Sequence, residues 1–518
     1  MEPDRQFEIQ LGHMCNNRCV FCVSGQRTAN RDAFPLAAEP LVEKLREGRA
    51  MGMRKVTFLG GEPTLQPEFM TCVREAVALG FDEIVIFTNG AKTARAEFID
   101  EVLATGGRFA WRLSFQGGNA LAHERTTKKL GSFGRLRETM EHLKARGQKV
   151  SVNMCVVQSN YASVADFPAL MARYGIWQIH LDMMRPKDAG ERSDDELRAT
   201  IPRYSDMVPA LEAMVRGFPD SVDVNVGNLP FCVAPQLAPW IHHDGNKTLT
   251  VAIDSRDQLS EPWDKYEVKA RDKVKRDACV TCAFDERCAG VYEKYTEFYG
   301  MDEFAPVPRE RLVQLDPARR LFTLHAAPHV RALQGWTLPA PFTALSVVEH
   351  DRERAWDITL SNAQGAELAV TLRPPGAGGV AATDVFSLHV QRTRGDVPTR
   401  ALRDLFARLA QGARCAVVHP VAEDALGAAD PRVRACLARL RARAPFEGLR
   451  WRDARVSGDG REATMSFEDP AGGEVLVGVS IEGSGVRGGY RLGSPAPEKT
   501  PALVAGVRAV MDAMRTPV

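Results

Sequence analysis

Cysteines are the residues of this chain whose spacing points most clearly to chemistry. Cys15, Cys19 and Cys22 follow an apolar run that predicts a strand, and their spacing is C-x(3)-C-x(2)-C. Three thiolates on one short loop can each bind one iron of a [4Fe–4S] cube, which leaves the fourth iron open to a small ligand. Structural zinc, the alternative, usually has four ligands, and the nearby His13 lies within the end of the strand. The triplet therefore favours an iron–sulfur cluster.

A glycine-rich segment ends the second expected strand, in Gly60-Gly61-Glu62-Pro63. The glycines allow backbone to approach a ligand closely, and the carboxylate can accept a hydrogen bond from an ammonium group. An ordinary turn between a strand and a helix would explain the glycines and the proline, but not their coincidence with the cysteine triplet. Together the two motifs resemble the radical S-adenosylmethionine (SAM) superfamily, and the resemblance covers roughly residues 6–220.

This resemblance implies an enzyme of the oxidoreductase type. A cluster on Cys15, Cys19 and Cys22 would give one electron to SAM, and the resulting 5′-deoxyadenosyl radical would abstract hydrogen from a substrate. An electron donor such as flavodoxin or ferredoxin is implied as a partner. The residues that the family pattern assigns to SAM are Gly60, Gly61, Glu62 and Pro63 around its amino group, Asn89 after the third strand, Ser114 and Arg125 at its carboxylate, and Asn153 at its ribose.

A second group of cysteines stands further along the chain, at Cys232, Cys279, Cys282 and Cys288. The spacing C-x(2)-C-x(5)-C resembles the SPASM and twitch extensions that bind auxiliary clusters, but position 292, where the full SPASM pattern has another cysteine, is a tyrosine. Four ligands suffice for one further [4Fe–4S] cluster, so the resemblance favours the shorter, twitch-like form and two clusters in all. An auxiliary cluster bound by all four cysteines would transfer electrons. If Cys232 is not a ligand, one iron of the cluster would be open and could bind substrate. A four-cysteine zinc site is the alternative.

The other cysteines are isolated, and each is expected to be a small buried apolar residue. They are Cys72, Cys155, Cys415 and Cys436. His242 and His243, which lie between the cysteines of the second group, are expected to be surface or substrate contacts rather than ligands.

The elements that must position these residues follow from hydrophobic periodicity. Six strand-like runs, each followed by a helical pattern, predict a parallel α/β sheet, best described as a partial (β/α)6 barrel with its chemistry at the carboxyl ends of the strands. The runs are Phe7–Leu11, Lys55–Leu59, Glu83–Thr88, Phe109–Phe115, Lys149–Val157 and Gln178–Met183. The predicted domains are a radical SAM core at 1–222, an auxiliary cluster domain at 223–308, and a C-terminal α+β region at 309–518. The C-terminal region repeats a pattern of strands and a helix, which predicts two units at about 340–412 and 446–516.

Composition narrows the range of functions. Lys and Arg number 67 against 66 Asp and Glu, so no net field favours nucleic acid, and a tRNA-modifying role is less favoured. We expect a cytoplasmic protein, because neither a signal peptide nor an apolar run of membrane-spanning length is found. Auxiliary clusters of this kind accompany peptide modification, so a peptide maturase is the first hypothesis. Oxidation or rearrangement of a small molecule is the second, and a non-catalytic cluster scaffold is disfavoured by the intact Gly60-Gly61-Glu62.

Overall fold

The computed structural model describes most of the chain in two compact units, Met1–Leu315 and Asp316–Val518. None of the described helices is long and apolar enough to cross a membrane. Cys415, which the sequence suggested to be a buried apolar residue, lies outside the described residues. The described residues are 5–243, 245, 248–254, 258–351, 353–376, 381–382, 385–410, 429–443, 446, 449–457, 461–469, 472–482, 485–493 and 500–515.

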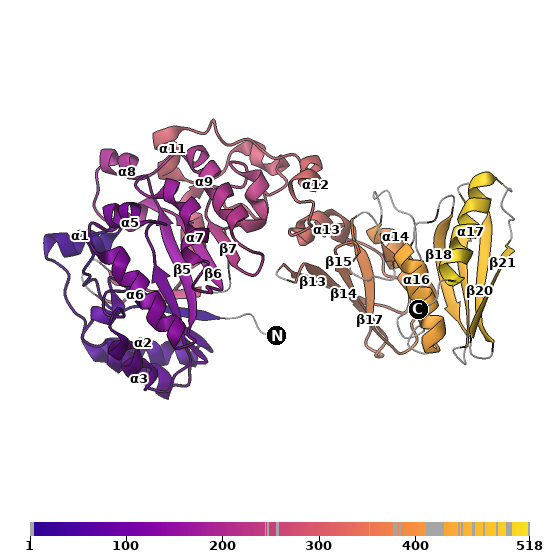
Figure 1. The fold of residues 1–518 in the computed structure, drawn as a ribbon, viewed down its shortest axis with the longest axis horizontal. Helices are drawn as coiled ribbons and strands as arrows, with labels where there is room; N and C mark the ends of the chain where they lie inside the picture. Colours follow the sequence, from indigo (N-terminus) through magenta and orange to yellow (C-terminus); the bar gives the residue numbers. More distant parts are fainter. Residues whose placement is uncertain are drawn as a thin grey trace. The chain divides into compact units, whose positions relative to one another are not determined.

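The first unit is built on the predicted parallel sheet (Figure 1). Its first six strands lie side by side in chain order, and all of their pairings are parallel. Each predicted run agrees with a strand to within one residue at either end, so the α/β class is confirmed. The strands are β1 Gln6–Gln10, β2 Lys55–Leu59, β3 Glu83–Thr88, β4 Phe109–Ser114, β5 Lys149–Val156 and β6 Gln178–Met183.

The sheet extends beyond these six strands on both edges. Within the described residues it has ten strands, in the order β10-β9-β1-β2-β3-β4-β5-β6-β7-β8. The added strands are β7 Asp223–Gly227, β8 Ile241–His242, β9 Thr248–Val251 and β10 Trp263–Asp264. Three of them pair in parallel, and only β10 is antiparallel. The sequence did not predict these four added strands. Two of them, β8 and β10, have only two residues each, which is too short to show a period.

Helices connect the strands of the first unit. The helical pattern expected after the fifth strand forms a 3₁₀ turn, η2 Tyr161–Asp166, and then α7 Phe167–Met171. Pro168 lies in the first turn of α7, where a missing N–H costs least. Two helices that the sequence did not predict, α1 and α5, follow Cys22 and β4. The α-helices are α1 Val23–Asn30, α2 Ala38–Ala50, α3 Phe69–Ala78, α4 Ala96–Leu103, α5 Ala120–Thr127, α6 Ser132–Ala145, α7 Phe167–Met171, α8 Asp194–Thr200, α9 Tyr204–Gly217, α10 Lys265–Arg271, α11 Glu293–Tyr299 and α12 Leu312–Leu315.

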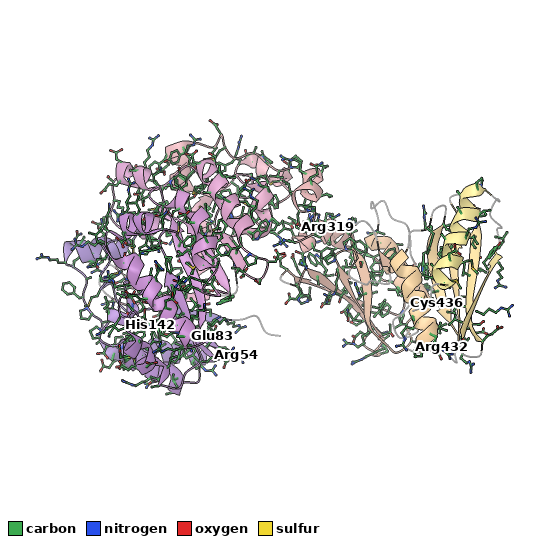
Figure 2. The ribbon with its side chains drawn as sticks, viewed as in Figure 1. Arg54, Glu83, His142, Arg319, Arg432 and Cys436 are labelled. Atoms are coloured by element: carbon green, nitrogen blue, oxygen red, sulfur yellow. The ribbon has the colours of Figure 1, made fainter. Side chains whose placement is uncertain are left out.

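A charged cluster joins three strands at their amino ends. The Glu83 carboxylate on β3 pairs with Lys55 Nζ on β2 at 2.6 Å and with Lys149 Nζ on β5 at 3.0 Å (Figure 2). Burial by itself raises the pKa of Glu83, but the two lysines outweigh it and hold that pKa below its ordinary value. This end of the sheet therefore carries a stabilising ion-pair network, opposite the carboxyl ends where the cysteine motifs stand.

The second unit contains the strands and helices that the apparent repeat predicted. Each half has a leading helix, antiparallel strands and a closing helix, and each has its own apolar core. Cys436 is fully buried in the core of the second half (Figure 2). The first half comprises α13 Phe322–Arg331, β13 Ala344–His350, β14 Ala355–Ser361, β15 Glu367–Arg373, β16 Ala381–Ala382, β17 Ser387–Arg394 and α14 Thr399–Leu409. The second comprises α16 Pro431–Arg443, β18 Arg450–Val456, β19 Glu462–Glu468, β20 Glu474–Glu482, β21 Gly485–Leu492 and α17 Pro501–Arg515.

Candidate active site

The loop that carries Cys15, Cys19 and Cys22 is fixed by backbone hydrogen bonds on two sides. On one side, Gly61 N donates to Gly12 O at 2.7 Å and Glu62 N donates to Met14 O at 2.9 Å. On the other side, the loop donates to the last residues of α5, from Arg18 N to Thr127 O at 2.9 Å and from Val20 N to Thr126 O at 3.1 Å. The cysteine loop is thus held between the carboxyl end of β2 and the end of α5.

Gly60 and Gly61 are required by this packing. A Cβ atom on Gly61 would lie 2.4 Å from the carbonyl oxygens of His13 and Met14. Gly60 has φ of +140°, and a Cβ atom there would lie 2.6 Å from Gly12 O. The structure therefore gives the two glycines a role that the sequence reasoning missed: they let β2 and the cysteine loop approach each other.

Glu62 is buried, with 1% of its surface exposed, and its carboxylate joins the ends of β2 and β3. Oε1 accepts hydrogen bonds from Thr64 N at 3.2 Å, from Thr64 Oγ1 at 2.6 Å and from Thr88 Oγ1 at 2.6 Å. Oε2 accepts one bond, from Asn89 N at 2.7 Å. Burial raises the pKa of Glu62, and the hydrogen bonds only partly oppose it. Oε2 is therefore the oxygen with room for a further donor, such as the ammonium group that the sequence assigned to this residue.

Asn89 connects this carboxylate to the cysteine loop. Its Nδ2 donates to Asn16 Oδ1 at 2.8 Å and lies 3.7 Å from Cys15 Sγ. Asn17 N also donates to Cys15 Sγ, at 3.4 Å. Two N–H groups directed at one sulfur are typical of the surroundings of a cluster ligand.

The thiols of this loop fit an iron–sulfur cluster by their chemistry. Burial raises the pKa of Cys15 to about 12, and the nearby Glu62 carboxylate adds to the rise. Burial also raises the pKa of Cys19 and Cys22. Buried thiolates of this kind are stable only beside a strong positive charge, which iron supplies. Among the described residues, no three His, Cys, Asp or Glu side chains surround a point where a single metal ion could bind.

The remaining residues that the sequence assigned to SAM lie at the same end of the sheet, with one exception. Ser114 on β4 and Asn153 on β5 are partners in register, and Ser114 Oγ accepts a hydrogen bond from Gln116 Nε2 at 2.6 Å. Pro63 is buried at the start of a 3₁₀ turn, η1 Pro63–Leu65. Arg125 is exposed on α5, the helix whose last residues hold the cysteine loop.

Cys155 lies closer to the triplet than the sequence suggested. We expected Cys72 and Cys155 to be buried apolar residues, and Cys72 on α3 is fully buried. Cys155 is half-buried at the carboxyl end of β5. Burial raises its pKa well above the ordinary value, and the negative charges of Asp182, Asp188 and Cys22 add to the rise. The thiol of Cys155 therefore interacts electrostatically with the cysteine loop.

The second cysteine group is brought together by a turn after β7, which carries Cys232, and by a loop around η5 Asp277–Thr281. The ring of Phe231 stacks on Phe284 with centroids 4.8 Å apart and planes at 11°. Burial raises the pKa of Cys232 to about 12, with further contributions from Cys288, Cys282 and Cys279. Val307 N donates to Cys282 Sγ at 3.3 Å. The four thiols that the sequence grouped as ligands are thus neighbours.

A small polar cavity of about 20 Å³, called the polar chamber below, lies near the carboxyl end of β6. Sequence reasoning missed it, although the alternating polar residues His180 and Asp182 on an otherwise apolar strand were a signal. His242 and His243, which we expected to be surface or substrate contacts, both line it, and His243 is 6% exposed. The lining residues are His180, Asp182, Asn228, His242, His243, Lys265, Tyr266 and Lys269.

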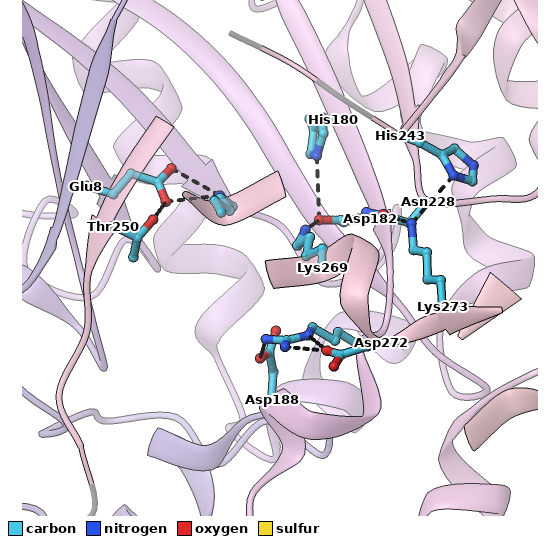
Figure 3. A network of polar contacts seen from close by, with 12 residues as sticks. Glu8, His180, Asp182, Asp188, Asn228, His243, Thr250, Lys269, Asp272 and Lys273 are labelled. Carbon is cyan, nitrogen blue, oxygen red and sulfur yellow. Dashed lines mark hydrogen bonds and ion pairs between the residues drawn. The ribbon is translucent and has the colours of Figure 1, made fainter. Parts of the chain in front are cut away.

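Two ion pairs hold α10 over the polar chamber (Figure 3). Lys269 Nζ pairs with Asp182 Oδ2 on β6 at 2.6 Å, and Lys265 Nζ pairs with Glu8 Oε2 on β1 at 3.0 Å. Burial raises the pKa of Asp182, but Lys269 outweighs it, so that pKa lies well below the ordinary value. Short helix α10 therefore bridges strands that stand on either side of the chamber.

Residues of the polar chamber interact with residues at or next to both cysteine groups. The charge of Asp182 acts on Cys155, which in turn lies near Cys22. On the other side, His243 Nδ1 accepts a hydrogen bond from Ala289 N at 3.0 Å, next to Cys288. The polar chamber is therefore bordered by a histidine bonded to the residue after Cys288, and its Asp182 acts on Cys155.

Comparisons with known proteins agree with this site. Residues 9–167 match the family model of the radical SAM superfamily. The chain is 28% identical over 334 residues to the mycofactocin maturase MftC of Mycolicibacterium smegmatis, an alignment that covers 58% of this chain and 80% of the relative. It is 26% identical over 204 residues to a probable GTP 3′,8-cyclase of Saccharolobus islandicus, which covers 38% of this chain and 63% of that relative.

Among solved structures, the chain is similar to Streptococcus suis SuiB bound to S-adenosylmethionine, with 14% identity, a TM-score of 0.39, and coverage of 58% of this chain and 76% of SuiB. The chain spans 50% of a second mycofactocin maturase, from Mycobacterium ulcerans. The family match ends at residue 167, within the first unit, and includes the cysteine triplet, Glu62 and Asn89. Residues 9–167 are therefore similar to the radical SAM superfamily.

Proposed function

We propose that this protein is a radical SAM enzyme that modifies a peptide or protein substrate. The observation that carries the proposal is the loop of Cys15, Cys19 and Cys22, held against Glu62 and Asn89 inside the matched domain. The similarity to a mycofactocin maturase over 80% of that relative supports a peptide substrate. The similarity to probable GTP 3′,8-cyclases supports the alternative, a small-molecule substrate.

The residues of the cysteine loop would hold a [4Fe–4S] cluster, and the open iron would bind SAM. When bound, the cluster and SAM supply the radical that removes hydrogen from the substrate. Glu62 Oε2 would accept from the SAM ammonium group. On the neighbouring strands β4 and β5, Ser114 would bind the SAM carboxylate and Asn153 the SAM ribose. Arg125 would reach the SAM carboxylate only from its exposed position on α5. The task of the chain is to orient SAM and to keep water away from the reacting atoms.

The second cysteine group would hold an auxiliary [4Fe–4S] cluster of the twitch-like form. Burial raises the pKa of Cys232 and of Cys288, and the charges of the other three thiols add to the rise at Cys232. These effects support ligation by all four cysteines, Cys232, Cys279, Cys282 and Cys288. A fully ligated cluster near the polar chamber would take up or return electrons during substrate oxidation. A cytoplasmic electron donor such as flavodoxin or ferredoxin would then serve the first cluster.

The test uses full-length protein, reconstituted with iron and sulfide without oxygen and given SAM and dithionite. We expect 5′-deoxyadenosine and methionine from the parent and neither from Cys19→Ala. Peptides encoded by short reading frames beside this gene are then added, and a change in peptide mass supports the maturase proposal. SAM cleavage that consumes a small molecule and leaves every such peptide unchanged would favour the alternative. A parent protein with full iron content and no SAM cleavage would overturn the proposal as a whole.

A further inference from the structure

An exposed basic surface borders the loop that carries the first three cysteines. Arg18 lies within this loop and is exposed, and its backbone N–H donates to Thr127 O, at the end of α5, at 2.9 Å. Lys128 and Lys129 follow directly and are also exposed, and the next residue, Leu130, is 86% exposed. These four residues, Arg18, Lys128, Lys129 and Leu130, are called the basic patch below.

The charges of the basic patch are not neutralised by the chain. In the part of the chain that the structure describes, no carboxylate forms an ion pair with Arg18, Lys128 or Lys129. Residues 120–138 contain five Lys and Arg against two Asp and Glu, and residues 12–31 contain three against none. Of the two acids, Glu124 is half-buried and accepts a hydrogen bond from Phe133 N at 3.3 Å, and the other lies on α6. The patch therefore carries a local excess of positive charge.

The other end of the cysteine loop, at Cys22 and α1, lies among acids. Burial raises the pKa of Cys22, and the negative charge of Asp188 adds to the rise. Glu191 is exposed, and its backbone N–H donates to Gln26 Oε1 on α1 at 2.9 Å. An acidic protein that approaches the loop would therefore be attracted at its α5 end and repelled at its α1 end.

We propose that the basic patch docks a one-electron carrier protein whose surface is acidic around its redox group. The inference rests on the proposed function, in which the first cluster must be reduced before SAM is cleaved. Electron transfer slows steeply with distance, and Arg18 directly precedes the cluster ligand Cys19, so a carrier on the patch is close to the cluster. The reduced carrier loses one electron and the cluster gains it, and no bond forms or breaks.

The chemistry of the patch fits a transient partner of this kind. Opposite charges on two surfaces speed association and fix orientation more than they add affinity. Leu130, next to the two lysines, supplies an apolar contact within the charged surface. Electron-transfer complexes have small interfaces, so a few exposed side chains around the cluster loop are sufficient.

Carrier binding is measured first, because it does not depend on SAM chemistry. Flavodoxin and ferredoxin, two acidic carriers, are each titrated by calorimetry at low salt into full-length protein with its clusters. We expect saturable binding of at least one carrier, with a Kd higher by about tenfold or more in the double variant Lys128→Glu, Lys129→Glu. The difference should shrink in 1 M salt, where the Debye length is about 3 Å compared with about 10 Å at 0.1 M.

The matched control reverses two other exposed charges, in Arg74→Glu, Arg108→Glu. Arg74 lies on α3, which Figure 1 shows well apart from α5, and Arg108 precedes β4 at the amino end of the sheet. Neither forms an ion pair in the described structure. This variant should bind the carrier as the parent does. Iron content and the melting temperature show whether each variant is folded.

SAM cleavage then separates this proposal from the proposed function. Dithionite needs no docking surface and should give the same rate of 5′-deoxyadenosine formation in the parent and in the lysine variant, whereas the reduced carrier should have a higher KM in the variant. A parent that binds neither carrier, unchanged carrier affinity in the folded lysine variant, or an equal loss in the arginine control would overturn the proposal. So would binding of tRNA that the lysine variant loses while its carrier affinity is unchanged. If the carrier binds as expected and dithionite yields no 5′-deoxyadenosine, the docking surface stands and the proposed function falls.

Discussion

Glu62→Gln is the substitution that best separates ligand binding from structure in this site. Gln keeps the oxygen that accepts three hydrogen bonds from Thr64 and Thr88, so the amide group takes the place of Oε2 and faces Asn89 N. The hydrogen bond from Asn89 N, 2.7 Å long in the parent, is lost. The new amide N–H and Asn89 N–H are both donors, and they face each other in a buried place. We expect the free energy of unfolding to fall by about 1–3 kcal/mol.

The same substitution removes the negative charge proposed to face the SAM ammonium group. A hydrogen bond to a charged group contributes about 1.5–3 kcal/mol, so the KM for SAM should rise by roughly 10- to 100-fold. The assay is 5′-deoxyadenosine formation over a range of SAM concentrations, with iron content measured on the same samples. Iron should stay at the parent level, because Gln still accepts from Thr88 and leaves the cysteine loop in place.

Glu83→Gln is the matched control, since Glu83 is also a buried glutamate but stands at the opposite end of the sheet. It loses its ion pairs with Lys55 and Lys149 and should lower stability without changing the KM for SAM. If Glu62→Gln lowers stability as Glu83→Gln does and leaves the KM for SAM unchanged, Glu62 only joins β2 to β3, and its assignment to SAM is refuted.

Three further predictions test other parts of the molecule. Reconstituted protein should hold about eight irons per chain when its metal content is measured, as expected for two [4Fe–4S] clusters. Replacing Cys15, Cys19 and Cys22 by Ala should leave about four irons. A parent protein with about four irons and stoichiometric zinc would contradict the auxiliary cluster. A chain ending at Leu315, where the first compact unit ends, should keep both clusters and still cleave SAM, whereas loss of iron would show that the second unit is needed for folding. The pKa of Glu83 is lower in the folded state than in the unfolded one, so its stabilisation is present above its unfolded pKa of about 4.3 and is lost as pH falls through the folded pKa. Urea unfolding of the parent and of Glu83→Gln should therefore differ at pH 7 and converge at acid pH.

The sequence predicted the parallel sheet because its strands are long and apolar enough to show their period. β2, β3 and β6 begin and end at the predicted residues. It missed β8 and β10, which have two residues each, and α5, whose eight residues have no clear apolar face. The local hydrophobic pattern therefore predicts the strands and helices that bury an apolar face of their own. It misses the elements that form only because they pair with distant parts of the chain.

The candidate site was predictable only where its residues are close in the chain. The cysteine triplet and Glu62 stand out by type and spacing, whereas the bonds of Glu62 to Thr88 and Asn89 join residues 26 and 27 positions apart. The ion pair of Asp182 with Lys269 spans 87 positions. No spacing rule connects such residues, because only the order of strands in the sheet brings them together.

The strand order also shows how the segment after β6 is joined to the region that matches the radical SAM model. β7 and β8 extend one edge of the sheet, while β9 pairs with β1 at the other edge. The segment after residue 222 therefore adds strands to both edges of the sheet, and the lysines of α10 pair with Glu8 and Asp182. The sheet thus continues across the predicted limit at residue 222, and the polar chamber is walled from both sides of that limit. The walls of the chamber come from β6 and from α10, which lie on the two sides of residue 222, so the two segments must fold together for the chamber to exist.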